Sequence, residues 1–232
     1  MTGQRRDIER RAALASVDLE AVIAVVTTTV GAMFGPVGAI AGAFVGPYAK
    51  HAATRLIELR SRVEEAGVDS ETLVGRLDEN EALAHLIAEV VRGTVDSDLA
   101  AKRALLARAA IRALENDSVV DIEQRIVRTA NQVDTVDIRL LALLCKPTPE
   151  RRESASVTAE ELVSRWPGVA DVVSGTTSSL IAAGLIKTGS PGTLRPRMSW
   201  KPTSYGRLFL ERLQSEGLDD ELLARGSADA DR

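Results

Sequence analysis

The distribution of apolar residues divides the chain into an uncharged N-terminal stretch and a series of amphipathic segments. Residues 21–49 contain no charged side chain. Gly35-Pro36 divides this stretch, because proline lacks an amide hydrogen and restricts the residue before it. We therefore predict one helix near 18–33 and a second from Pro36 to Ala66, with a kink at Pro47.

Beyond this stretch, apolar residues recur at helical spacing, and capping residues separate the groups. Asp78 with Glu81 resembles a capping box, and Asp96-Ser97 and Asp134-Thr135 are further candidate caps. The predicted apolar faces are Leu83, Leu86, Ile87, Val90 and Val91; Leu99, Leu105, Leu106, Ala109 and Leu114; Ile122, Ile126, Ala130 and Val133; and Ile138, Leu141 and Leu144.

The last third of the chain mixes helical and strand signals. Residues 146–156 hold two prolines and charges of both signs, which predicts an exposed linker. Thr158 with Glu161 forms a capping box, and a further helix is expected over 169–184. Residues 185–201 then alternate around a Gly-Ser-Pro-Gly turn, which predicts a hairpin, and Thr203 begins a last helix.

The order helix, linker, helix, turn, helix, hairpin, helix is that of a winged helix-turn-helix. The segments VDIRLLALL (136–144), LIAAGLIKTG (180–189) and WKPTSYGRLFLERL (200–213) carry this likeness. With its upstream helices, the chain resembles an uncharacterised family of bacterial and phage helical proteins that end in a winged-helix-like module. The resemblance implies a topology and no activity.

The expected fold is therefore mainly α, with a helical N-terminal domain over 1–133 and a C-terminal winged helix-turn-helix (small α+β) module over 134–215. Residues 216–232 are polar and acidic, which predicts a disordered tail. The predicted core of the module is Leu180, Leu185, Ile186, Leu208 and Phe209. Trp166 is expected to pack at its edge.

Charge separates this module from the rest of the chain. The whole chain carries a net charge of -4, which disfavours general polyanion binding. Residues 157–215, however, hold seven Lys and Arg against four Asp and Glu. The candidate contacts to nucleic acid lie on the wing and are Lys187, Arg195, Arg197 and Lys201. The candidate reading helix has Asp171 and hydroxyls but no cation, so contact with phosphates is expected rather than base reading. A protein partner for the module is the alternative.

Glycines spaced by four mark the uncharged stretch: Gly31, Gly35, Gly38, Gly42 and Gly46. Such spacing lets another helix backbone approach closely. Two tightly packed core helices are the favoured interpretation, and self-association into a homo-oligomer and membrane insertion are the alternatives. Membrane contact is disfavoured, because Gly35-Pro36 leaves two pieces of about 13 residues, or about 20 Å, against a hydrocarbon core of about 30 Å.

No pattern typical of a catalytic, cofactor or metal site emerges. His51, His85 and Cys145 are far apart, whereas zinc sites normally show close ligand pairs. The single cysteine and the absence of a secretory signal predict a cytoplasmic protein. We expect a non-enzymatic regulatory or adaptor protein whose module contacts DNA or a partner protein. The alternative is a membrane-associating effector that uses residues 21–49.

Overall fold

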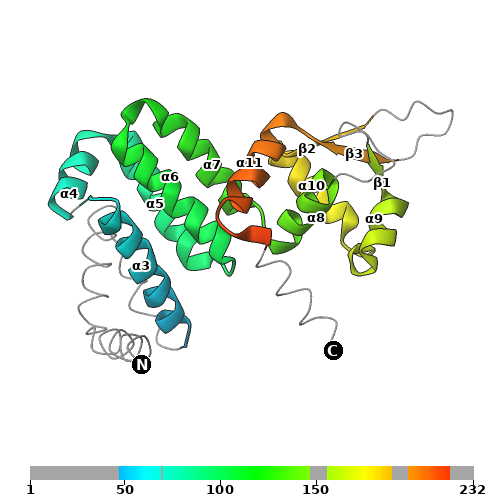
Figure 1. Ribbon diagram of the computed structural model, residues 1–232, viewed down its shortest axis with the longest axis horizontal. Coiled ribbons are helices and arrows are strands. Elements are labelled where there is room, and N and C mark those ends of the chain that lie inside the picture. Colours follow the sequence, from blue (N-terminus) through cyan, green and yellow to red (C-terminus); the bar gives the residue numbers. More distant parts are fainter. Residues whose placement is uncertain (1–46, 69, 147–155, 190–197, 220–232) are drawn as a thin grey trace, which may run out of the picture.

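The computed structural model describes residues 47–68, 70–146, 156–189 and 198–219. It is mainly helical, with a small three-stranded antiparallel sheet near the C-terminal end (Figure 1). The helices are α3 (Pro47–Glu65), α4 (Ser70–Glu79), α5 (Glu81–Asp96), α6 (Ala100–Glu115), α7 (Val120–Gln132), α8 (Thr135–Cys145), α9 (Ala159–Arg165), α10 (Val173–Ala182) and α11 (Ser204–Gln214). The strands are β1 (Val157–Thr158), β2 (Ile186–Thr188) and β3 (Ser199–Pro202).

Helices α3 to α7 lie at one end of the molecule, and α8 to α10 with the sheet lie at the other (Figure 1). Helix α11 lies between the two groups and packs against both α6 and α8. Buried leucines such as Leu106 in α6 and Leu180 in α10 belong to one hydrophobic core. The core extends to Leu218, a fully buried residue in the segment predicted as a tail. The predicted helical and C-terminal regions are therefore packed together over the described part of the chain.

Three of the predicted helix starts, at Asp134, Thr158 and Thr203, are confirmed, and Thr203 caps α11 by accepting the N–H of Gly206. The Asp134 carboxylate accepts the backbone N–H of Asp137, and the Asp137 side chain accepts the N–H of Asp134 in return. Thr158 and Glu161 form the same reciprocal pair at the start of α9. Each pair satisfies two backbone donors that the first turn of a helix would otherwise leave without a partner.

The predicted starts at Asp78 and Asp96 are wrong. Helix α4 was not expected, and it runs through Asp78 to Glu79, so Asn80 caps α5 instead by accepting the N–H of Leu83. Helix α5 continues through Asp96, and α6 begins only at Ala100. In both places the residue that favours a cap lies instead in the last turn of the preceding helix, α4 for Asp78 and α5 for Asp96.

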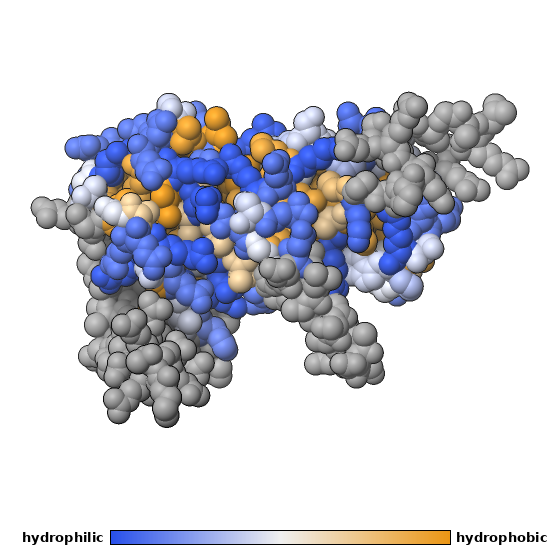
Figure 2. All heavy atoms as spheres, in the orientation of Figure 1, coloured by the Kyte–Doolittle hydropathy of each residue, from blue (hydrophilic) through white to orange (hydrophobic). Residues whose placement is uncertain are grey.

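The predicted apolar faces point into the core with two corrections. Hydrophilic residues cover most of the molecular face drawn in Figure 2, and hydrophobic ones show through in small groups. Ile122 is 56% exposed in the first turn of α7, and Leu208 is 43% exposed on α11. Phe209 and Leu213, four residues apart, form the buried face of α11, so Leu208 is turned about 100° away from it. Trp166 is half-buried at the edge of the core, with the Arg139 guanidinium 5.4 Å from its ring.

The hairpin prediction is confirmed for both strands. Strand β3 lies in the centre of the sheet, and the order is β1-β3-β2 with both pairings antiparallel. The turn residues 190–197 and most of the linker 146–156 lie outside the described residues, as does the predicted kink region before Pro47. Helix α10 begins at Val173 rather than 169, because a 3-10 turn at Pro167–Val169 precedes it.

Candidate nucleic-acid interface

Two of the four predicted contact residues form a pair on the hairpin. Lys187 on β2 lies directly opposite Lys201 on β3. Such opposed residues have Cα atoms about 4.5–5.5 Å apart, and like charges there destabilise the strand pairing. Neither lysine forms an ion pair with another described residue. The hairpin therefore holds two cations side by side, and no carboxylate in the described part of the chain pairs with them.

The alternation of the strands directs this pair toward solvent. Trp200 and Pro202, on either side of Lys201, are buried against the helices, and Ile186 beside Lys187 is buried too. Successive side chains on a strand point to opposite faces. Lys187 is exposed and Lys201 half-buried, and the alternation places both lysines on the face of the sheet opposite Trp200. Arg195 and Arg197 belong to the turn of this hairpin and lie outside the described residues.

Three of the five hydroxyl groups of α10 donate hydrogen bonds within the protein. The Thr177 hydroxyl donates to the Val173 carbonyl at 2.7 Å, and the Ser178 hydroxyl donates to the Ser174 carbonyl at 2.8 Å. The Ser179 hydroxyl donates to Oδ2 of Asp137 on α8 at 2.9 Å. A reading helix needs free donors and acceptors on its outer face, so α10 offers few groups that could read bases.

Asp137 holds α10 against α8. Its carboxylate is buried and accepts hydrogen bonds from both the Asp134 N–H and the Ser179 hydroxyl. Burial raises the pKa of Asp137, and these two hydrogen bonds act in the opposite direction. The sequence prediction found the Asp134 cap but missed Asp137. The sequence does contain a signal for this residue, because an acid three residues after an N-cap is typical of a capping box.

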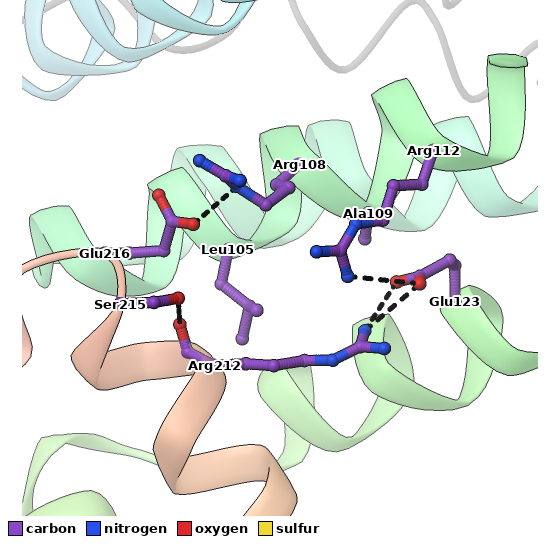
Figure 3. A pocket seen from close by; sticks show the side chains of 8 residues that line it. All are labelled: Leu105, Arg108, Ala109, Arg112, Glu123, Arg212, Ser215 and Glu216. Atoms are coloured by element: carbon purple, nitrogen blue, oxygen red, sulfur yellow. Dashed lines mark hydrogen bonds and ion pairs between the residues drawn. The ribbon is translucent and has the colours of Figure 1, made fainter.

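A second charged cluster joins α6, α7 and α11 (Figure 3). Arg212 on α11 donates to both oxygens of buried Glu123 at 3.1 and 2.9 Å, and Arg112 on α6 lies 3.6 Å from the same carboxylate. Arg108 pairs with buried Glu216 at 2.6 Å. The space between these side chains is about 10 Å³, enough for no more than one water. The cluster therefore ties helices together and is no ligand site.

An open groove of about 330 Å³ adjoins this cluster, between α3 and α6. Its charged lining residues are Arg62, Arg108 and Arg112 against Glu65, Glu115 and Glu216. Because the two signs balance, the groove favours neither an anion nor a cation. The distance in sequence between its walls explains why it could not be predicted.

The remaining candidate residues are dispersed. His85 is exposed, 3.8 Å from Glu81, and Cys145 is half-buried at the end of α8. Burial raises the pKa of the Cys145 thiol to about 11. Among the described residues, no three His, Cys, Asp or Glu side chains gather as metal ligands would. The same part of the chain has no helix whose length and apolarity would suit a membrane crossing. Gly31, Gly35, Gly38, Gly42 and Gly46 lie outside it.

No protein-family model, curated protein or solved structure matches the chain. Its function must therefore be inferred from its own residues.

Proposed function

We propose that this is a non-enzymatic regulatory or adaptor protein whose region 134–215 is a winged-helix-like module that contacts DNA through its hairpin. The observation that carries the proposal is the pair Lys187 and Lys201, two cations opposed on the outer face of the hairpin. A phosphate group placed between them would remove the repulsion of the pair. Contacts of this kind supply most of the affinity in sequence-independent DNA binding.

The arrangement of the elements supports the same proposal. Helices α8, α9 and α10 precede a hairpin, and a third short strand, β1, completes the antiparallel sheet. In this order α10 takes the place of a reading helix and the β2–β3 hairpin takes the place of a wing. The capping of α11 by Thr203, which also donates to the Gly184 carbonyl, fixes the base of the hairpin.

The mode of contact follows from the chemistry of the two elements. The hairpin offers cations, which suit phosphates, and α10 carries no charged residue and has three of its five hydroxyls bonded internally. We therefore expect weak, salt-sensitive binding that differs little between DNA sequences. Arg195 and Arg197 would add to the same phosphate contacts.

Fluorescence anisotropy with two labelled duplexes of unrelated sequence tests the proposal at low salt. The double variant Lys187→Ala, Lys201→Ala should bind both duplexes on the order of 10- to 100-fold more weakly. The matched control is Arg60→Ala, Arg92→Ala, which removes the same charge from exposed positions on α3 and α5. It should bind almost as the parent does.

An equal loss in both double variants would overturn the assignment to the hairpin. A strong preference of the parent for one duplex would overturn the phosphate-dominated mode. Absence of binding to either duplex would overturn the DNA proposal, and the module's target would then be a protein.

A further inference from the structure

No further inference is drawn: the strongest candidate, the open groove between α3 and α6, is lined by arginines and glutamates in equal number, and nothing in the described part of the chain shows what would cover it.

Discussion

The contact between α11 and the start of β2 makes a sharp prediction at Gly206. This glycine is buried in the first turn of α11. A Cβ atom there would lie 2.0 Å from the Leu185 carbonyl oxygen and 2.8 Å from the Leu185 carbonyl carbon. The carbonyl is held in place, because it accepts a hydrogen bond from the Thr203 N–H at 2.9 Å. The Gly206→Ala variant can therefore fold only if α11 moves away from β2 by about 1 Å.

The cost follows from this geometry. Overpacking of a buried site costs about 1–3 kcal/mol. Alanine recovers at most about 1 kcal/mol over glycine in a helix, and less in the first turn. We expect a net loss of about 1–2 kcal/mol, which in a chain of this size lowers Tm by about 2–8 °C.

Thermal and urea unfolding followed by circular dichroism measure this loss. The control is Gly75→Ala in the middle of α4, where an added Cβ would meet no atom within 4 Å. That variant should be unchanged or more stable by up to about 1 kcal/mol. A Gly206→Ala protein as stable as the parent would refute the packing of α11 on Leu185.

Three further predictions concern buried polar groups. Burial raises the pKa of Cys145 to about 11. Alkylation of this thiol by iodoacetamide at pH 8 should therefore be roughly 100-fold slower than that of free cysteine. A rate equal to that of free cysteine would refute the burial of Cys145. Glu123→Gln leaves Arg212 without its buried carboxylate, so the free energy of unfolding, measured in urea, should fall by about 1–3 kcal/mol. The exposed control Glu115→Gln should change this free energy little. Equal effects of the two substitutions would show that the ion pair of Glu123 with Arg212 does not hold the helices together. Because burial raises the pKa of Asp137, the folded state binds this proton more tightly than the unfolded state. Its contribution to stability should therefore fall as pH rises from the ordinary carboxyl range through the raised pKa, and then level off. The urea midpoint of unfolding, measured at a series of pH values, should lose this decrease in the Asp137→Asn variant. The same pH dependence in the variant and the parent would show that Asp137 does not cause the decrease.

Local patterns in the sequence were enough to predict the helices that combine a cap with an apolar stripe. Helix α8 is an example, because Asp134 and the leucines that follow it agree on one start. Helix α4 could not be predicted, since Gly75 weakens its helical signal and its stability comes from packing. Strand β1 is only two residues long and forms through pairing with β3, a contact that no local pattern specifies.

The candidate site was also only partly predictable from the sequence. The hairpin and its basic character follow from alternation and composition, but the direct opposition of Lys187 and Lys201 depends on register. The orientation of the α10 hydroxyls depends on contacts across the fold, such as Ser179 with Asp137. Sequence alone placed hydroxyls on this helix and could not tell whether they faced DNA or the protein.

The salt dependence of DNA affinity tests the central claim most directly. For duplex DNA, the slope of log affinity against log salt changes by about 0.9 for each phosphate contact. Removing Lys187 and Lys201 together should therefore make the slope shallower by about 1.8. The Arg60→Ala, Arg92→Ala control should keep the slope of the parent. A Lys187→Ala, Lys201→Ala protein with the parent's slope would contradict the proposal that this hairpin grips the phosphate backbone.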